Sequence, residues 1–419
     1  MKRSNHKILI ISYFFPPNTG AGVQRPLRLV KNLINSGWDV TVLTSTLDIT
    51  NLDFTLSKKI PKETSLVYMD DPLQKLLKKI NSPLFHKVIS FLLFPDRVFF
   101  WYFFNRNSVL KLLSQKSIST VYITVGPYSA SLFGSFIKKR MPEIKFILDY
   151  RDAWTNNPSV RYSKFKPLFT FLNLYVEKYV NSFADVITTV SNFLTQEIIT
   201  VNKEKIKVLY NGYDSSDFKT CRRLAVEEYN IFFSGSLYAE RNPDLFLTPF
   251  LHFYNKLDKK DKDLISLTFV GDSRTTYIQK ITDIIPGSIK LKIENYIPHE
   301  DLLDLASQSA LLLLLVDNIP GAKGVVTGKV FEYINLPSPI LGIVPLDGEA
   351  AKVIKDTNTG FVFEPGKIDC IVEFLFNDFH NWKKDPLRKD WNNNKNVEII
   401  TKYSDQHQFL EFKKACLIG

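Results

Sequence analysis

Short, continuous runs of apolar residues alternate along this chain with longer stretches whose apolar residues recur at helical spacing. Runs such as Lys7–Ser12 and Ala310–Val316 are typical of strands in a parallel sheet, which are covered on both faces. The stretch Val23–Ser36 has helical spacing, with Pro26 in its first turn and Gly37 as a C-cap. This alternation predicts an α/β fold. The remaining predicted strands are Val40–Leu43, Val121–Val125, Lys145–Leu148, Val186–Val190, Lys207–Leu209, Asn230–Phe233, Leu267–Val270, Lys290–Ile293, Pro339–Val344 and Phe361–Phe363.

Two series of strands and helices lie on either side of the polar segment Ser215–Glu228. The 419 residues fit two domains of ordinary size, and 45% hydrophobic residues are enough to build packed cores. We therefore expect Rossmann-like domains at 1–210 and 211–395. The polar, helical pattern of 396–419 predicts a C-terminal helix that crosses back to the first domain.

The stretch Gly321–Ile334 combines a Gly-rich, basic loop with the start of a helix near Thr327, directly after a predicted strand. Free N–H groups and the helix dipole make such a helix start suitable for an anion. Lys329 adds a charge in the first turn, and Glu332 lies on the same face three residues later. One cation and one carboxylate suit a phosphate and a ribose, so we predict a nucleotide-sugar site here.

The first predicted strand is followed by the loop Tyr13–Gly22, which contains Gly20 and Gly22. These glycines would let the backbone approach a bound diphosphate and would leave space for a sugar. An ordinary tight turn is the alternative interpretation. Their spacing differs from G-x-G-x-x-G, so the dinucleotide fingerprint is absent.

Three ionisable residues lie within four positions after the strand Lys145–Leu148. Ligands of doubly wound sheets bind at the carboxyl ends of strands, where such groups are expected to be functional. We predict that Asp152 orients or deprotonates an acceptor hydroxyl, with Arg151 and Asp149 as its pairing groups. A purely structural Asp–Arg pair is the alternative. In the second half, Gly235 and Arg241 are candidates to meet a phosphate.

The segment Leu73–Lys116 carries eight basic residues against Asp96 alone, which is +7 of the chain's net +11. Its first part has the pattern of a basic amphipathic helix, and two aromatic-rich apolar runs follow. This combination favours docking to an anionic membrane interface. A solvated helix face with core aromatics is the alternative, and nucleic acid is disfavoured because no recognised motif is present. The candidate membrane or acceptor residues are Lys75, Lys78, Lys79, Arg97 and Trp101.

The three cysteines are far apart and form no C-x-x-C pair, which disfavours a disulfide or metal framework and favours a reducing cytosol. The sequence has no signal-peptide pattern and no apolar run near the roughly 18–20 residues of a membrane span. We expect a cytoplasmic location, with peripheral attachment to the inner membrane face through the basic segment.

Several short motifs follow one another over nearly the whole chain, and the last of them is the most specific. They are Pro16-Pro17 with Gly20 and Gly22, Pro95-Asp96 followed by Trp101, Asp149-x-Arg151-Asp152-x-Trp154, Asn211-Gly212-x-Asp214 with Phe218, Gly235, and Lys329-x-x-Glu332-Tyr333. In this order they resemble the retaining glycosyltransferases of family 4. The resemblance implies the GT-B fold, in which two Rossmann-like domains with parallel sheets face a central cleft.

The same resemblance implies roles for individual residues. Glu332 matches the glutamate that binds the donor ribose, and the base is expected near Gly271 and Tyr296-Ile297. The groups expected at the diphosphate are Gly235, Arg241, Thr327, Gly328 and Lys329. The resemblance also implies that these groups replace a divalent metal, so we expect no cofactor besides the nucleotide-sugar co-substrate. The only D-x-D sequence, Asp261–Asp263, lies in a run of charges and reads as a solvated loop.

Three features depart from the family pattern. Gly324 stands where the family has a glutamate that touches the donor sugar, and backbone N–H groups from Gly324 to Gly328 are candidates to replace it. The usual basic pair near Gly235 is reduced to Arg241, and no histidine lies between Asp149 and Trp154. None of the six histidines belongs to a recognisable motif.

The predicted function is transfer of a sugar, with retention, to a lipid-linked or membrane-proximal glycan acceptor. Assembly of a bacterial surface polysaccharide such as lipopolysaccharide or capsule is the setting that the resemblance implies. Two alternatives stay open: a nucleotide-sugar epimerase of the same fold, and a non-catalytic nucleotide-binding subunit, which Gly324 motivates.

Overall fold

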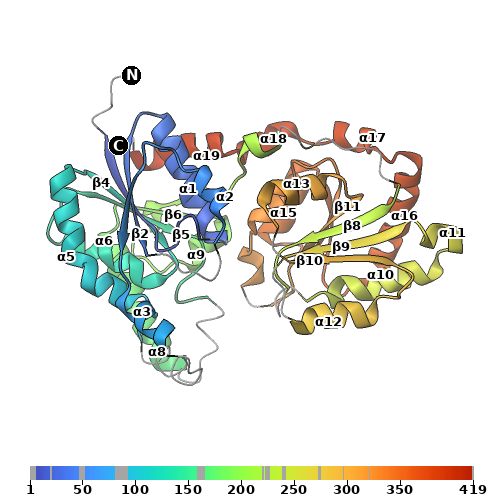
Figure 1. The fold of residues 1–419 in the computed structure, drawn as a ribbon, viewed down its shortest axis with the longest axis horizontal. Coiled ribbons are helices and arrows are strands. Elements are labelled where there is room, and N and C mark those ends of the chain that lie inside the picture. The colour runs from blue at the N-terminus through green and yellow to red at the C-terminus, as the bar shows by residue number, and fades with distance from the viewer. Residues whose placement is uncertain are drawn as a thin grey trace. The chain divides into compact units, whose positions relative to one another are not determined.

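The computed structural model describes residues 6–18, 21–46, 52–80, 93–157, 166–218, 221, 227–237, 242–271, 275–295, 297–319 and 321–417. The chain forms two compact units (Figure 1). Unit 1 comprises Met1–Tyr210 with Gln408–Gly419, and unit 2 comprises Asn211–His407. Within the described residues, no helix has the length and apolar character needed to cross a membrane.

Unit 1 is built on a seven-stranded parallel sheet with the order β3-β2-β1-β4-β5-β6-β7. The strands are β1 (Lys7–Ile11), β2 (Asp39–Ser45), β3 (Ser65–Met69), β4 (Thr120–Val125), β5 (Lys145–Tyr150), β6 (Val186–Thr189) and β7 (Ile206–Val208). The sequence predicted six of these seven strands. It missed β3, an edge strand whose residues are only partly buried and therefore lack a continuous apolar run.

Alternate residues of the unit 1 strands enter two separate cores, one on each face of the sheet. Leu9 and Ile11 of β1 face a core that contains residues of α5, α6 and α8. Ile8 and Ile10 face a core shared with α1 and the C-terminal helix α19 (Figure 1). The helical segments are α1 (Ala21–Asn35), α2 (Phe54–Lys58), α3 (Pro72–Lys79), α5 (Phe99–Lys116), η1 (Tyr128–Ser131), α6 (Leu132–Lys138), α8 (Lys166–Phe183), α9 (Asn192–Glu197) and η2 (Lys203–Lys205).

Two local predictions in unit 1 have different outcomes. Ser191 caps α9 as expected, because its hydroxyl accepts a hydrogen bond from the backbone N–H of Leu194 at 3.3 Å. Pro26 lies inside α1 instead of in its first turn, because the helix begins at Ala21, two residues before the predicted start.

Unit 2 contains a six-stranded parallel sheet with the order β10-β9-β8-β11-β12-β13. The strands are β8 (Tyr229–Ser234), β9 (Ile265–Val270), β10 (Lys290–Glu294), β11 (Leu311–Leu315), β12 (Ile340–Ile343) and β13 (Gly360–Phe363). All five leucines of β11 are buried, as expected for a central strand that is covered on both faces. The sequence predicted each of these strands to within about two residues.

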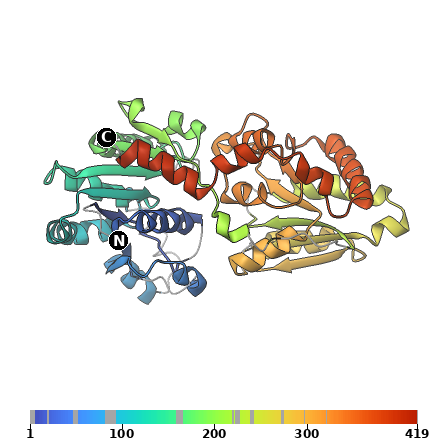
Figure 2. The same cartoon turned by 90° about the horizontal axis from the view of Figure 1, so that it is seen from above.

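Helices cover the unit 2 sheet, and α16 packs beside α10 over a core rich in phenylalanine (Figures 1 and 2). The helical segments are η3 (Ser215–Phe218), α10 (Asp244–Lys256), α11 (Lys259–Lys262), α12 (Thr275–Ile284), α13 (His299–Ser307), η5 (Ala322–Gly324), α14 (Gly328–Tyr333), α15 (Glu349–Thr357), α16 (Ile368–Lys384), α17 (Lys389–Asn393) and α18 (Val397–Lys402).

The C-terminal tail is divided into helical segments instead of forming the single helix that was predicted. After α18, the chain continues as α19 (Asp405–Phe412) and one turn of π-helix, η6 (Lys413–Leu417). A break at Tyr403 and Ser404 separates α18 from α19, because Tyr213 binds the backbone there. Its N–H donates to the carbonyl of Tyr403 at 3.1 Å, and its carbonyl accepts from the N–H of Asp405 at 2.8 Å.

Candidate functional site

Two glycines meet at the carboxyl ends of neighbouring strands in unit 2. Gly235 follows β8 with φ +108°, and Gly271 follows β9 with φ +139°. A Cβ on Gly271 would lie 2.7 Å from the carbonyl carbon of Gly235, so neither position tolerates a side chain without strain. The two loops therefore present bare backbone at the edge of the sheet where ligands of parallel sheets bind.

Lys329 lies over this pair of glycines from the first turn of α14. Its ammonium group donates to the carbonyl oxygen of Ser234 and lies 4.4 Å from the centre of the Phe233 ring. A Cβ placed on Gly235 would come within 2.4 Å of the Lys329 Nζ atom. The absence of a side chain at Gly235 thus makes room for the lysine charge, and the two residues act as one unit.

The buried hydroxyl of Tyr333 fixes α14 against the end of β8. It accepts a hydrogen bond from the backbone N–H of Ser234 at 3.1 Å and lies 3.0 Å from the Ser234 hydroxyl. Burial raises the pKa of Tyr333, so the phenol stays protonated at neutral pH. The helix that carries Lys329 and Glu332 is therefore held firmly to the strand that ends at Gly235.

Glu332 belongs to a cluster of ionisable groups that the sequence analysis missed. Its Oε1 atom lies 3.0 Å from Nε2 of His299, and Nδ1 of His299 lies 3.8 Å from Oδ2 of Asp217. All three side chains are between 15% and 19% exposed. Asp217 and His299 are 82 positions apart in the sequence, and His299 and Glu332 are 33 positions apart. No local pattern could therefore have revealed the cluster.

The loop before α14 carries several of the residues that were predicted to contact the donor. The Thr327 hydroxyl has no hydrogen-bond partner among the described residues, although the atom is buried, and a Cβ on Gly328 would meet no atom within 4 Å. The N–H groups of Gly324 and Val325 are already used inside the turn η5, at 3.1 and 3.0 Å. They are therefore unavailable as substitutes for the glutamate that Gly324 replaces.

Some predicted site residues fall outside the part of the chain that the structure describes. Ile297 is half-buried between β10 and α13. The residues that lie outside the described ranges are Gly20, Arg241 and Tyr296.

In unit 1, the structure overturns the predicted pairing of Asp149 with the loop that follows it. Asp149 is fully buried and forms a bidentate ion pair with Arg25 of α1, at 2.7 and 2.9 Å. Thr188 donates a further hydrogen bond at 2.6 Å. Burial alone would raise the pKa of Asp149, but the Arg25 charge and these hydrogen bonds outweigh it, and the pKa is lowered. Because Asp149 ends inside the sheet, it cannot reach Asp152.

Arg151 lies among glycines at the carboxyl ends of the central strands. Its Nη2 atom donates to the carbonyl oxygen of Gly126 at 3.1 Å, and a Cβ on Gly22 would lie 2.2 Å from Nη1. The buried Nε atom has no acceptor among the described residues. Gly22 therefore provides space for an arginine, so the predicted approach of this backbone position to a ligand stays a prediction.

Asp152 is exposed at the end of the loop. Burial raises the pKa of Tyr128, and the negative charge of Asp152 adds to this effect, which places the carboxylate near the phenol. Trp154 is buried, stacks on Tyr128 with ring centres 5.0 Å apart, and donates to Asn173 at 2.8 Å. Asp152 is thus an accessible carboxylate two positions before a buried, hydrogen-bonded tryptophan.

The residues predicted to contact a membrane differ in their exposure. Trp101 is a core residue with no exposed surface: it donates to the Met69 carbonyl at 3.1 Å and packs edge-on against Phe133. It cannot reach a membrane surface. Arg97 is exposed, and Lys75 is exposed in an ion pair with Asp70 at 2.6 Å. The side chains of Lys78 and Lys79 lie outside the described part of the chain.

A different apolar surface appears on α8, which the sequence analysis did not single out. Four large apolar residues on one face of this helix are 40% to 64% exposed, and their spacing of three or four residues defines a stripe. We call it the α8 stripe: Leu168, Phe171, Leu174 and Tyr175. Three cationic side chains lie over aromatic rings of α5, α6 and α8. They are Arg106 over Phe103, Lys139 over Tyr179 and Arg140 over Phe136.

No group of three or more His, Cys, Asp or Glu side chains within the described residues is placed to hold a metal ion. The expectation that no metal takes part stays a prediction.

Two kinds of comparison with known proteins give matches: one with a family profile and one with solved structures. Residues 23–217 match the profile of Glycosyltransferase Family 4. No curated protein matches the sequence. Among solved structures, sucrose-phosphate synthase from Thermosynechococcus elongatus aligns with a TM-score of 0.66 at 12% identity, covering 98% of both chains.

Two further structures give the range of activities found on this fold. WaaG, a glycosyltransferase involved in lipopolysaccharide biosynthesis, has a TM-score of 0.62 at 15% identity and covers 98% of this chain and 100% of its own. A putative UDP-N-acetylglucosamine 2-epimerase from Listeria monocytogenes has a TM-score of 0.57 at 13% identity and covers 98% and 96%. The chain therefore has the GT-B fold, and the match over 23–217 supports its resemblance to glycosyltransferase family 4.

Proposed function

We propose that this protein transfers a sugar from a nucleotide-diphosphate sugar to a glycan hydroxyl, and that unit 2 binds the donor. The observation that carries the proposal is the arrangement of Lys329 over Gly235 and Gly271. It places a positive charge directly beside two glycine loops at the carboxyl ends of β8 and β9, the edge where ligands of parallel sheets bind. The match to Glycosyltransferase Family 4 over residues 23–217 supports the same activity.

The chemistry follows from where charge develops. Breaking the anomeric C–O bond leaves negative charge on the diphosphate, and a positioned cation stabilises that charge in the transition state. Lys329 supplies the cation, and the hydroxyl of Thr327 at the start of the same helix, which has no partner among the described residues, supplies a neutral donor. We propose that these groups replace a divalent metal ion, and that Glu332 accepts hydrogen bonds from the ribose hydroxyls in exchange for its contact with His299.

For the acceptor, we propose that the exposed carboxylate of Asp152 orients or deprotonates the attacking hydroxyl. Its place in a loop that the buried Trp154 anchors by stacking on Tyr128 favours such a positioning role. Attack on the face from which the diphosphate departs would retain the anomeric configuration and needs no protein nucleophile.

The acceptor is proposed to be lipid-linked or to lie close to a membrane. The α8 stripe is an exposed apolar surface, and Lys139 lies 5.1 Å from the ring centre of Tyr179, one turn beyond Tyr175 on the same helix. This combination suits the anionic interface of a bilayer. Bacterial surface polysaccharide assembly, at the inner face of the cytoplasmic membrane, is the setting that we propose. WaaG, which shares the fold, is described as acting in lipopolysaccharide biosynthesis.

A thermal-shift panel of UDP-, GDP-, dTDP- and ADP-sugars tests donor binding. A ligand that binds only the folded state stabilises it by about 2.7 kcal/mol when its concentration is 100 times Kd. We expect one nucleotide class to raise Tm in the wild type and to have a much smaller effect on Lys329→Ala. Glu398→Ala, on exposed α18, is the matched control and should behave like the wild type. If no nucleotide sugar raises Tm, the proposal is wrong.

An epimerase is the second candidate, because a putative epimerase shares the fold over nearly the whole chain. Incubating the protein with the donor alone separates the two activities. Conversion of the donor to an epimer without any acceptor would favour the epimerase, whereas release of nucleotide diphosphate only when a glycan acceptor is present supports transfer. Donor binding with neither reaction would favour a non-catalytic subunit.

A further inference from the structure

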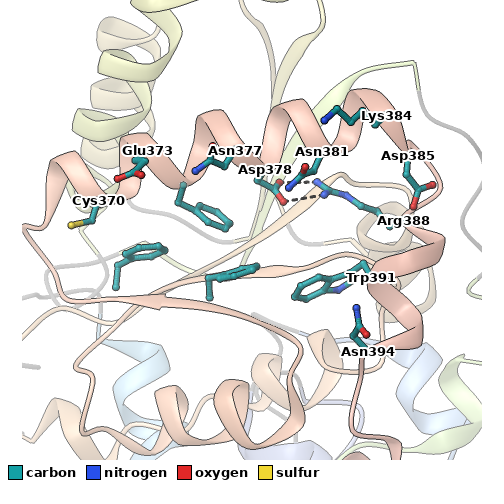
Figure 3. A pocket seen from close by; sticks show the side chains of 13 residues that line it. Cys370, Glu373, Asn377, Asp378, Asn381, Lys384, Asp385, Arg388, Trp391 and Asn394 are labelled. Atoms are coloured by element: carbon teal, nitrogen blue, oxygen red, sulfur yellow. Dashed lines mark hydrogen bonds and ion pairs between the residues drawn. The ribbon is translucent and has the colours of Figure 1, made fainter.

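Unit 2 contains a cavity of about 660 Å³ that shares no residue with the candidate donor site (Figure 3). It lies between the edge strand β13 and the helices α16 and α17. Its volume falls in the range of small-molecule sites, about 300–1,000 Å³. The proposed transfer reaction assigns no task to this cavity.

Aromatic rings form one side of the cavity. Phe361 and Phe363 alternate along β13 and therefore point to the same face of the strand. Their ring centres lie 4.9 and 5.4 Å from that of Phe374, and Trp391 lies 5.5 Å from Phe361. Phe361 is 43% exposed, which is unusual for a phenylalanine in a strand and marks the open side of the cavity.

The opposite side is polar and comes from a single face of α16. Glu373, Asn377 and Asn381 are spaced by four residues, so they follow one another along that face (Figure 3). Asn394, after α17, adds a third amide to the lining. Amide groups both donate and accept hydrogen bonds, so this side suits a ligand that carries hydroxyl groups.

Two buried N–H donors in the lining have no acceptor among the described residues: Nε of Arg388 and Nε1 of Trp391. Arg388 is 5% exposed. Its two Nη atoms are occupied by Asp378, at 3.0 and 2.7 Å, and Asp378 also accepts from Tyr229 at 2.6 Å. The ion pair holds the arginine in place, and Nε is left without a partner.

Arg388 also has a backbone conformation that is rare for its residue type, with φ +54°. A left-handed non-glycine residue at the start of α17 is strained, and such strain concentrates at ligand sites. It begins the turn that brings Trp391, three residues later, into the lining.

We propose that this cavity binds a neutral sugar ring of a glycan. The C–H groups of a pyranose carry partial positive charge and pack on the negative faces of aromatic rings. Its hydroxyl oxygens can accept from Arg388 and Trp391 and exchange hydrogen bonds with the amides of α16.

The charges of the lining favour a neutral ligand over an anionic one. Three carboxylates face two cations, so a phosphate or a sugar acid would meet net negative charge. The ionisable residues of the lining are Glu373, Asp378, Asp385, Lys384 and Arg388. A nucleotide is therefore disfavoured here, whereas it is favoured beside Lys329. The cavity would hold a glycosyl residue of the acceptor or product at a position separate from the donor.

Ligand-detected NMR on the full chain tests this inference. The probes are neutral disaccharides of glucose, galactose, mannose, rhamnose and N-acetylglucosamine at up to about 10 mM, which detects a Kd near 1 mM. Glucuronic acid and UDP serve as charged comparators. We expect at least one neutral disaccharide to bind, and glucuronic acid to bind more weakly or not at all.

Variants assign the binding to the cavity. Phe361→Ala removes an exposed ring, and Asn377→Ala removes an exposed amide, so both should fold. Each should weaken the disaccharide by about twofold to tenfold. Trp391→Phe keeps an aromatic ring but removes the Nε1 donor and part of the aromatic surface, and it should also weaken disaccharide binding. His380→Ala, which changes an exposed residue of α16 outside the lining, is the matched control and should bind as the wild type does.

The experiments can distinguish a failure of the proposed sugar site in this cavity from a failure of the proposed donor site. Lys329→Ala should abolish the nucleotide-sugar shift and leave disaccharide binding unchanged. The inference is overturned if no neutral disaccharide binds the wild type, if binding is unaffected by Phe361→Ala and Asn377→Ala, or if UDP competes for the same site.

Discussion

Units 1 and 2 are both built on a parallel sheet, but different residues lie at the carboxyl ends of their central strands. In unit 1, Asp149 is the second-last residue of β5, and it is buried and held by Arg25 from α1. In unit 2, β8 and β9 are followed directly by Gly235 and Gly271, which carry no side chains. A buried charge pair occupies one end, whereas at the other end Lys329 fills the space that a side chain on Gly235 would take. The charge is thus neutralised inside the sheet of unit 1, whereas unit 2 brings the Lys329 ammonium group to the ends of its strands.

The exposed apolar residues of the two units also differ in their arrangement. Unit 1 exposes the α8 stripe along one helix, whereas Phe361, an exposed aromatic of unit 2, belongs to a cavity. A convex apolar stripe suits an extended surface such as a bilayer interface, and a concave aromatic site suits a small ligand. Each of the following changes tests one side of this comparison.

The largest effect is expected from Asp149→Asn. It removes one partner of a buried, bidentate ion pair and leaves Arg25 buried without its counter-charge, which costs about 3–5 kcal/mol of stability. Urea unfolding measures the loss, and hydrogen exchange should locate it in unit 1. Asp152→Asn, three residues later and exposed, is the control and should change stability by less than about 0.5 kcal/mol. Similar losses for both variants would contradict the structural role of Asp149.

The pH dependence of the same pair has a defined sign. The pKa of Asp149 is lowered in the folded protein, so its stabilisation is complete above the unfolded value of about 3.9. It is lost as the pH falls through the lower pKa of the folded state. The difference in stability between wild type and Asp149→Asn should therefore be constant near neutral pH and shrink only in strong acid. A difference that shrinks around pH 6 would require another titrating group.

The second effect concerns the charge over the glycines of unit 2. Lys329→Met should lower kcat by roughly 100-fold, because one donor to a developing oxyanion contributes about 3 kcal/mol. Release of nucleotide diphosphate in the presence of an acceptor measures the rate. Lys323→Met removes an exposed lysine from the same loop, where it pairs with Asp347 at 2.5 Å, and should leave kcat within about twofold. Equal effects of the two substitutions would mean that Lys329 acts only through overall charge.

The fold was largely predictable because each central strand is a local apolar run. Leu311–Leu315 and Lys7–Ile11 need only their own residues to be recognised. The edge strand Ser65–Met69 was missed because half-exposed residues give no continuous run. Lys329 and Glu332 were found together because they share one helix turn.

The partners of the site residues were not predictable, because they come from distant positions. Arg25 and Asp149 are separated by 124 residues, and His299 and Glu332 by 33. Only the folded chain brings the two members of each pair together. Trp101 was assigned to a surface because aromatic residues in a basic segment fit both a membrane and a core, and only packing against Phe133 decides between them.

A smaller effect is expected from Glu332→Ala. It should weaken donor binding by about 1–3 kcal/mol, since a charged hydrogen bond to the ribose is lost. Isothermal titration with the nucleotide sugar measures the change. Glu300→Ala, on exposed α13 beside His299, is the control and should bind as the wild type does. Normal donor binding by Glu332→Ala would remove the ribose from the proposed site and confine unit 2's role to the diphosphate.

The smallest effect is expected on the surface of unit 1. Phe171→Ser should weaken partitioning to anionic vesicles by about 1 kcal/mol, because part of one phenylalanine no longer leaves water. Val397→Ser removes an exposed apolar residue from α18 in unit 2 and should change nothing. Lys139→Ala should weaken binding by about 1 kcal/mol to anionic vesicles only, because neutral lipid offers its charge no partner. If Phe171→Ser instead abolishes self-association in sedimentation and leaves vesicle binding intact, the α8 stripe contacts a second copy of the chain, and the contrast between a membrane-facing unit and a ligand-binding unit fails.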